Sequence, residues 1–148
     1  MTITIKLIFI DSAAYHAALL LREQVLRKPL GLELNESDLA NEINEYHLAA
    51  FDQEKLVGCV SLRPINSSII KLRQMAVEPT YQRKGIGRQL LDYAEKITLS
   101  QGFREIELHA RYEAKGFYEK LGYQAHGKFF IEVTIPHILM KKTIHKSK

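Results

Sequence analysis

The residues best suited to chemistry form one short segment that follows a strand-like run and opens a helix-like one: Gln82, Arg83, Lys84, Gly85, Ile86, Gly87 and Arg88. Glycines have no Cβ atom, so the backbone can approach a ligand closely. The first N–H groups of a helix have no partner inside the helix, and the helix dipole makes that end positive. With three basic side chains added, the segment predicts a phosphate-binding site. A tight turn with a solvated basic rim is the alternative interpretation.

Two common nucleotide-binding motifs do not fit this segment. A P-loop opens its helix with Gly-Lys-Ser/Thr, whereas here Lys84 precedes Gly85 and no hydroxyl follows to hold magnesium. A dinucleotide-binding fingerprint needs a third glycine, where this chain has Leu90, and an acid at the end of the next strand, where it has His109 or Ala110. The sequence therefore disfavours both motifs.

Strand-like runs surround the segment on both sides. Residues 2–10 alternate, which predicts a strand with Ile3, Ile5, Leu7 and Phe9 on one face. Residues 105–110 also alternate, with apolar side chains on one face and Glu105, Glu107 and His109 on the other. The remaining predicted strands cover residues 47–51, 56–63, 69–77, 123–133 and 135–144, the last of them beginning near Pro136.

Helical patterns separate some of these strands. Ser12 can cap a helix that runs from residue 13 to residue 28 and is stopped by Pro29 and Gly31. A short polar helical stretch is expected at 37–44, a helix with one apolar stripe from 86 to Gly102, and a short helix over 112–121. The basic segment therefore sits at the start of a helix, where its amides are free.

Composition narrows the class of protein. The 148 residues predict one domain over 1–148, and 46% hydrophobic with 26% charged residues is ordinary globular usage. The lone Cys59, in an apolar strand, excludes an intramolecular disulfide and is expected to be a buried thiol. Six dispersed histidines predict no metal site. No apolar run approaches the ~20 residues of a membrane span, and the N-terminus has no signal-peptide cleavage site, so a cytoplasmic protein is expected.

Charge is distributed unevenly along the chain. Residues 1–70 hold six basic and nine acidic side chains, whereas residues 71–148 hold fifteen and eight. From Pro29 to Glu54 there are seven acids and no Lys or Arg. One half could bind a polyanion while the other accepts cations, or the chain simply has two solvated faces. The final MKKTIHKSK is interpreted as a solubilising tail.

Two blocks of sequence resemble the GNAT N-acetyltransferases, which use acetyl-CoA. The stretch LRQMAVEPTYQRKGIGRQLLDYAEK is similar to that family's cofactor motif, and GFYEKLGYQAHG is similar to the block after its fifth strand. The resemblance implies an α+β, three-layer α/β/α fold with a mixed, mostly antiparallel sheet of about seven strands. That sheet opens between two central strands to admit acetyl-CoA, and helices cover both faces.

The resemblance also implies site residues. Backbone groups of Met75, Ala76 and Val77 would bind the pantetheine arm, and the segment Gln82–Arg88 would cradle the pyrophosphate. Arg111 stands where the family often has an Asn that bonds the cofactor arm, and an Arg there could donate to the arm or reach a phosphate. Tyr118 falls on the family's general acid, whose phenol protonates the departing thiolate. Its alternative role is core packing with Phe117.

The general base stays open at this point. Glu78, Glu107 and His109 lie near the ends of predicted central strands, and a water chain to one of them would also serve. Glu132 and His137, near the last two strands, could line an acceptor pocket.

The expected activity is acetyl transfer from acetyl-CoA to a primary amine by direct attack. The acidic stretch from Glu33 to Glu54 suggests a cationic acceptor, either a small amine or a protein amine. A non-catalytic acyl-CoA sensor is the alternative. Nucleic-acid binding is disfavoured because the basic residues are not interleaved with aromatic ones. A homodimer through the last strands is compatible with the sequence.

Overall fold

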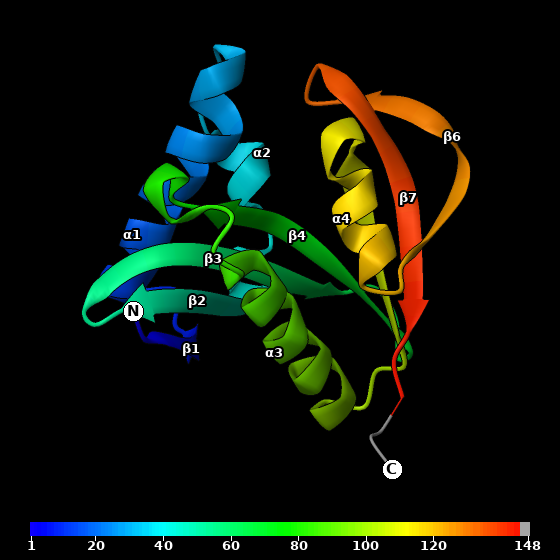
Figure 1. The fold of residues 1–148 in the computed structure, drawn as a ribbon, viewed down its shortest axis with the longest axis horizontal. Helices are drawn as coiled ribbons and strands as arrows, with labels where there is room; N and C mark the ends of the chain where they lie inside the picture. The colour runs from blue at the N-terminus through cyan, green and yellow to red at the C-terminus, as the bar shows by residue number, and fades with distance from the viewer. Residues whose placement is uncertain (146–148) are drawn as a thin grey trace.

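One twisted sheet of seven strands runs through the molecule in the order β1-β2-β3-β4-β5-β7-β6 (Figure 1). The computed structural model describes residues 1–145, so residues 146–148 of the predicted tail and of the predicted 1–148 domain lie outside the described residues. The strands are β1 Ile3–Ile8, β2 Tyr46–Asp52, β3 Lys55–Pro64, β4 Ile69–Val77, β5 Glu105–Arg111, β6 Gln124–Glu132 and β7 Ile135–Thr143. Neighbours are antiparallel except β4 and β5, which are parallel. The prediction of a mixed, mostly antiparallel sheet is confirmed.

Helices cover both faces of this sheet, as the three-layer prediction requires. They are α1 Ala13–Arg22, continued by η1 Glu23–Arg27 and η2 Lys28–Leu30, then α2 Glu36–Leu39, η3 Glu42–Asn44, η4 Pro79–Tyr81, α3 Ile86–Ser100, η5 Tyr112–Ala114 and α4 Lys115–Lys120. The larger core holds α3 and α4 against one face, through side chains such as Leu90, Leu91 and Tyr118. A smaller core holds α1 against the other, through Tyr15, Ala18 and Leu21. None of the helices described is long and apolar enough to cross a membrane.

The first helix begins and ends for the predicted reasons. The Ser12 hydroxyl accepts a hydrogen bond from the Tyr15 amide at 3.1 Å, which caps α1. Gly31 ends the helical run with a φ of 72°, a left-handed value that glycine adopts without a Cβ clash. The predicted single helix over 13–28 is divided, because its last turns widen and then tighten as η1 and η2.

The first strand differs from the sequence prediction. Ile3 and Ile5 pack against the core beneath α3, but Leu7 is 40% and Phe9 77% exposed, while Ile8 is buried. The strand ends at Ile8, whose side chain points to the opposite face and joins the core under α1. The predicted alternation therefore holds within β1, but the strand ends before Phe9, and the face that carries Leu7 is no longer covered.

The end of the chain also differs from a simple tail. Met140 lies in β7 and is fully buried. Ile144, just beyond β7, is also buried, and its amide donates a hydrogen bond to the Arg104 carbonyl oxygen at 2.8 Å. The tail interpretation is thus wrong for residues 140–144, where side chains fill the core.

The two parallel strands separate part of the way along their length. They pair from Ile69–Glu105 to Leu72–Leu108 and no further among the described residues. A register shift against β3 interrupts β4 beyond Arg73, and Gln74 has a φ of 58°. Because the bulge bends β4 away from β5, a gap opens in the middle of the sheet.

Candidate active site

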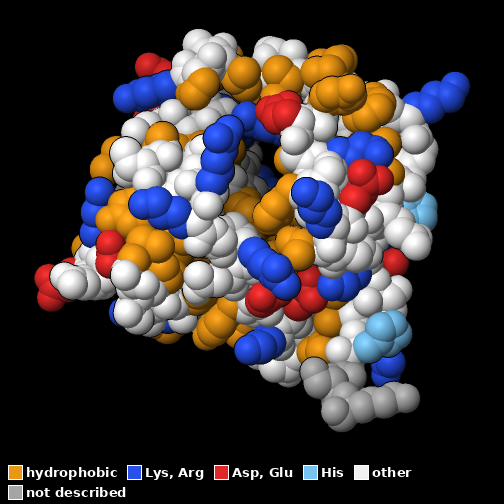
Figure 2. All heavy atoms as spheres, viewed as in Figure 1, with side chains coloured by type: hydrophobic (Ala, Val, Ile, Leu, Met, Phe, Trp, Pro, Cys, Tyr) orange, Lys and Arg blue, Asp and Glu red, His pale blue; other side chains and the backbone are white. Residues whose placement is uncertain are grey.

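A cavity of about 360 Å³ lies where β4 and β5 separate. Its walls come from both strands, from α4, from the end of η1 and from the β6–β7 connection. Figure 2 shows a hollow on this face, bordered by Lys and Arg side chains. The side chains that matter most for its chemistry are Lys71, Met75, His109, Tyr118, Glu132 and His137.

Tyr118, on α4, lines this cavity and is nearly inaccessible to solvent. Its hydroxyl lies 3.9 Å from the Met75 sulfur, and its ring packs edge-on against Phe117 and Tyr123. Burial raises the pKa of the Tyr118 phenol to about 12, so the hydroxyl keeps its proton at neutral pH. The residue therefore packs with Phe117 and also presents a protonated donor to the cavity.

The backbone of Met75, Ala76 and Val77 lies on the separated part of β4. One edge of this segment pairs with β3, through Ala76 opposite Cys59 and Val77 opposite Gly58. The other edge has no ladder partner on β5 among the residues described. Unpaired backbone groups facing a gap can bind an extended ligand as a neighbouring strand would.

The segment Gln82–Arg88 leads from η4 into α3 beside this gap. Gln82 donates a side-chain hydrogen bond to the Val77 carbonyl oxygen at 3.0 Å, which ties the loop to the end of β4. Gly85 caps α3 with a φ of 83°, and Ile86 buries its side chain in the core. Arg83, Lys84 and Arg88 are exposed. The predicted anion site thus combines the first turn of α3, whose amides point out of the helix, with exposed basic side chains around it.

Gly87 connects this loop to the cavity. A Cβ atom at Gly87 would lie 3.5 Å from the Phe117 ring and 3.7 Å from the Met75 sulfur. The start of α3 is therefore in contact range of the strand and helix that hold Met75 and Tyr118.

Arg111 turns toward the N-terminal helices. Its Nη2 donates to the Leu26 carbonyl oxygen at 2.9 Å, so the side chain joins the end of β5 to η1. It lines the cavity, and burial lowers the pKa of its guanidinium. No carboxylate lies within 4.0 Å of it in the described part of the chain.

Three side chains from β5, β6 and β7 meet on the wall of the same cavity as Tyr118. The His109 Nδ1 lies 2.9 Å from a Glu132 oxygen, and the His137 Nε2 lies 3.8 Å from the other oxygen. His137 is held in turn by its Nδ1, 2.9 Å from the Ile135 carbonyl oxygen. The hydrogen bond from His109 is the main reason that the pKa of Glu132 is lowered. This cluster joins an imidazole to a carboxylate on the wall of the cavity.

The structure separates the three proposed bases. The Glu78 carboxylate is exposed and accepts hydrogen bonds from the amide and hydroxyl of Thr80, which lower its pKa. Neither Glu78 nor Glu107 lines the cavity, whereas His109 does. Lys71 and Arg73 also line it and were missed. They alternate with the buried Ile70 and Leu72, which was the available signal.

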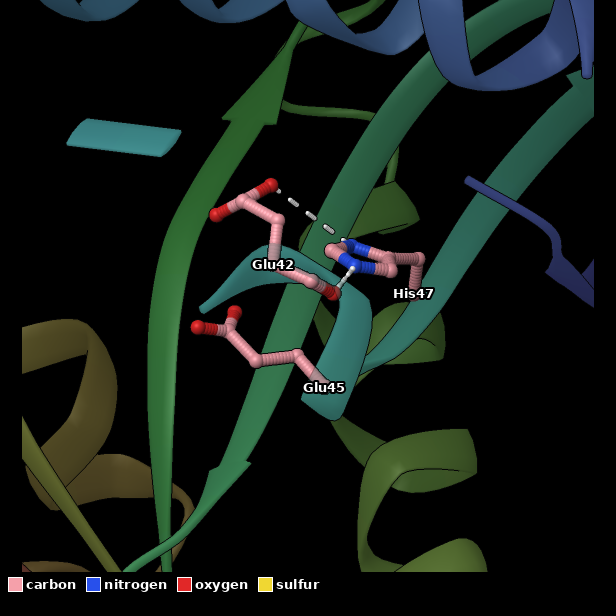
Figure 3. Close-up of side chains that lie close together, drawn as sticks. All are labelled: Glu42, Glu45 and His47. Atoms are coloured by element: carbon pink, nitrogen blue, oxygen red, sulfur yellow. Dashed lines mark hydrogen bonds and ion pairs between the residues drawn. The ribbon is translucent and has the colours of Figure 1, made fainter. Parts of the chain in front are cut away.

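A second group of ionisable side chains includes Glu42, Glu45 and His47, which lie close together (Figure 3). Glu42, Glu45 and His47 are buried, with ligand-type atoms within 4.8 Å of one another. Glu42 pairs with Arg22 at 2.7 Å, and Glu45 pairs with Arg63 at 2.6 Å and with Arg73 at 2.9 Å. We call these five Glu and Arg side chains the ion-pair network.

The ion-pair network weakens the argument for a cationic acceptor, because three of the seven carboxylates behind it are paired with arginines. Its two glutamates belong to the acidic stretch that suggested such an acceptor, and both are neutralised by arginines. Asp38, from the same stretch, pairs with Arg27 at 3.0 Å. These carboxylates therefore stabilise the fold and are not free to bind an ammonium. His47 is likewise occupied, by Ser61 at 3.0 Å and by the Glu42 carbonyl oxygen at 2.7 Å.

Cys59 agrees with its prediction. It is buried, and burial raises the pKa of its thiol to about 12. A thiol with this pKa is almost entirely protonated at neutral pH and is a poor nucleophile.

Comparison with known proteins settles the family. A family model described as an acetyltransferase (GNAT) domain matches residues 22–144. The chain belongs to the GNAT acetyltransferase family. A candidate acetyltransferase of Bacillus subtilis is 31% identical to this GNAT protein over 125 residues, 79% of this chain and 84% of that protein. The YitI N-acetyltransferase of the same organism is 28% identical over 86% of this chain and 91% of its own.

Solved structures confirm the fold of this GNAT protein. A candidate N-acetyltransferase from Lactobacillus plantarum superposes with a TM-score of 0.87 at 23% identity, over 98% of this chain and 100% of that one. An aminoglycoside 6'-N-acetyltransferase complexed with coenzyme A superposes with a TM-score of 0.78, also at 23% identity, over 98% and 99%. The predicted resemblance and the predicted acyl-CoA N-acyltransferase fold are both confirmed.

Proposed function

We propose that this protein transfers the acetyl group of acetyl-CoA to a primary amine by direct attack, with Tyr118 as the general acid. The observation that carries the proposal is the buried Tyr118 side chain on the wall of the cavity where β4 and β5 separate. Membership of the acetyltransferase family supports the reaction class.

Acetyl-CoA would enter through the gap in the sheet. The free backbone edge of Met75, Ala76 and Val77 would bind the pantetheine arm, and the segment Gln82–Arg88 would cradle the pyrophosphate. Arg111 would reach the arm from β5. Two structural neighbours support a coenzyme A ligand: the aminoglycoside 6'-N-acetyltransferase complex and a PaiA N-acetyltransferase from Thermoplasma acidophilum in complex with coenzyme A.

The proposed reaction needs two protein groups, a general acid and a general base. The amine nitrogen attacks the thioester carbonyl carbon and forms a tetrahedral intermediate, and collapse breaks the carbon–sulfur bond. A backbone N–H beside Met75 would stabilise the oxyanion. Tyr118 then gives its proton to the departing thiolate, and the amine loses one proton to a base. The products are the acetylated amine and the free thiol of coenzyme A.

His109 is the base that we assign. It lines the cavity with Tyr118, and its Nδ1 faces a Glu132 oxygen at 2.9 Å. If Nδ1 carries the proton of that hydrogen bond, Nε2 has a free lone pair that can accept the amine proton. Glu132 acts through His109 and is therefore a positioning residue, held from the other side by His137.

Ligand binding and turnover test the proposal together. Saturating acetyl-CoA should raise the thermal-unfolding midpoint, since a ligand at 100 times its Kd stabilises the folded state by about 2.7 kcal/mol. Free coenzyme A thiol should appear when a panel of primary amines is added. Binding without thiol release across the panel would favour a non-catalytic acyl-CoA sensor, and an equal shift with any polyanion would contradict the cofactor assignment.

Two further expectations stay predictions. A cytoplasmic location rests on the sequence alone. A homodimer through the last strands is supported by β6, which lies at the edge of the sheet and exposes Phe129 and Ile131. Light scattering across a concentration series would test the dimer.

A further inference from the structure

Lys71 is a cation that lines the cavity without a direct ion pair to a carboxylate among the described residues. It lies on β4, half-buried, with no carboxylate oxygen within 4.0 Å of its ammonium among residues 1–145. Burial is the main reason that its pKa is lowered, and the charges of Arg73 and Arg63 add to that effect. The charge of Glu132, the strongest of the neighbouring charges, and the weaker one of Glu107 oppose this lowering without outweighing it. An anion placed beside Lys71 would relieve this imbalance.

The cavity as a whole has the same imbalance. Five cationic and two acidic side chains line it. Asp38 is neutralised by Arg27, whereas Glu132 is hydrogen-bonded to His109 and, with a neutral His109, keeps a negative charge that offsets the cations in part. The guanidinium groups of Arg63 and Arg73 are likewise taken by the ion-pair network. Lys71 and Arg111 are left as the cations without a carboxylate partner in the described part of the cavity.

We infer that the acceptor is an amine that also carries an anionic group, and that Lys71 binds this group. The inference rests on the proposed function and names its substrate class. It replaces the cationic acceptor suggested by the acidic stretch.

The positions of Lys71 and His109 suit a small acceptor. Lys71 lies opposite Glu107 in the parallel ladder, and His109 follows two residues later on β5. Two residues of strand span roughly 7 Å. The anionic group would bind at Lys71, where the strands are still paired, while the amine lies near His109 and Tyr118, where they have separated.

Positive charge around the cavity also favours the reaction itself. An ammonium entering among cationic side chains is disfavoured relative to the neutral amine. Only the neutral amine has the lone pair that attacks the thioester. An anionic group on the same molecule offsets the repulsion at binding, whereas a diamine adds a second positive charge to it. The site should therefore discriminate strongly against polyamines.

A matched series of small amines tests the inference. The acceptors are β-alanine, its neutral amide, 1,3-diaminopropane and O-phosphoethanolamine, which share a short chain and differ in the charge of the far group. We expect kcat/KM to favour one of the two anionic acceptors over the amide and the diamine by roughly 10- to 100-fold, the worth of a hydrogen bond to a charged group. Which anion is preferred distinguishes a carboxylate site from a phosphate site. A preference for the amide or the diamine would overturn the inference.

Variants show whether Lys71 is responsible. Lys71→Gln should lower kcat/KM for the preferred anionic acceptor about tenfold more than for the amide. Lys96→Gln, on the exposed side of α3, is the matched control and should leave the preference intact. An equal loss for every acceptor in Lys71→Gln would contradict a role in recognising the anion.

A binding measurement separates this inference from the proposed function. The acetylated products, N-acetyl-β-alanine and its amide, bind without any turnover, and each is added to the wild type and to Lys71→Gln in thermal-unfolding runs. If no amine is acetylated but the anionic product stabilises only the wild type, the proposed reaction fails and the anion site stands. Transfer without preference for anionic acceptors leaves the reaction and overturns the anion site. If neither transfer nor selective binding is observed, both fail.

Discussion

The ion-pair network and the cavity cluster of His109, Glu132 and His137 are two groups of ionisable side chains that differ in how far their bonding capacity is used. In the ion-pair network, the Glu42 side chain is 1% exposed and bonds to Arg22, Tyr15 and Arg73. In the cavity, the Glu132 side chain is 40% exposed and holds His109 in an open space. A dense set of charges is therefore a poor marker of a functional site when every charge has a partner.

The ion-pair network still serves the site, because it fixes the strand on which the site is built. Glu42 and Glu45 flank η3, while Arg63 lies on β3 and Arg73 on β4, immediately before the bulge at Gln74. Three elements are thus tied together at the point where β4 begins to leave β5. The network positions the cavity wall, and the cavity side chains carry the chemistry.

The largest effect is expected from breaking the network. Glu42→Ala should lower the free energy of unfolding by about 3–5 kcal/mol, because it leaves the charge of Arg22 buried without a partner. The buried Arg22 Nε has no hydrogen-bond partner among residues 1–145, so losing Glu42 would add to an existing deficit. Denaturant titration measures the loss. Glu132→Ala is the control from the cavity and should cost far less stability, since that side chain is partly solvated. A similar loss in both variants would remove the distinction between the two groups.

The next-largest effect distinguishes a tyrosine hydroxyl that takes part in the reaction from one that only stabilises the fold. Tyr118→Phe should reduce turnover about 10²- to 10³-fold, as expected for loss of a general acid, with little change in acetyl-CoA affinity. Tyr123→Phe is the matched control, because its hydroxyl bonds to Glu95 at 3.1 Å outside the cavity. It should lower stability by about 1 kcal/mol and leave turnover unchanged. Steady-state rates and unfolding midpoints of the two variants would show opposite patterns. Full activity of Tyr118→Phe would contradict the assigned acid.

A smaller and pH-dependent loss is expected for the base. His109→Gln should reduce turnover about 10²-fold near neutral pH. The loss should shrink as the pH approaches the pKa of the acceptor amine, which then loses its proton without help. A pH–rate profile detects this recovery, which a purely structural defect would not produce. His16→Gln, an exposed histidine on α1, should match the wild type throughout.

Much of the fold could be predicted from the sequence, and so could part of the cavity lining, including Met75, Arg111 and Tyr118. Lys71 and Arg73 were missed. Periodicity identified the strands, and two sequence blocks indicated the opened sheet, because these signals are local. Contacts between distant residues were not predictable. Glu42 and Arg73 are 31 residues apart, and His109 and Glu132 are 23 apart. The acidic stretch resembled a cation site because its arginine partners come from α1, β3 and β4.

Acid titration should give the smallest effect and sharpen the same comparison. Burial alone would raise the pKa of Glu42, but the hydrogen bond and charge of Arg22 outweigh it and hold the pKa below its ordinary value. A carboxyl whose pKa is lower in the folded than in the unfolded state stabilises the fold above its unfolded pKa, and this stabilisation is lost as the pH falls through the folded pKa. Stability should therefore fall below about pH 4.5, by at most about 1.4 kcal/mol per pH unit for each such carboxyl.

Variants that remove one carboxyl at a time show which group causes the loss of stability at low pH. The milder Glu42→Gln should flatten it, because the amide cannot take up the proton that the wild type binds. Glu132→Gln should leave the slope close to that of the wild type: the pKa of Glu132 is lowered as well, mainly by the hydrogen bond from His109, but its exposure weakens the contribution to stability. Equal flattening in both variants would mean that the cavity carboxylate stabilises the fold as strongly as the buried one, so that solvent access does not separate the two groups.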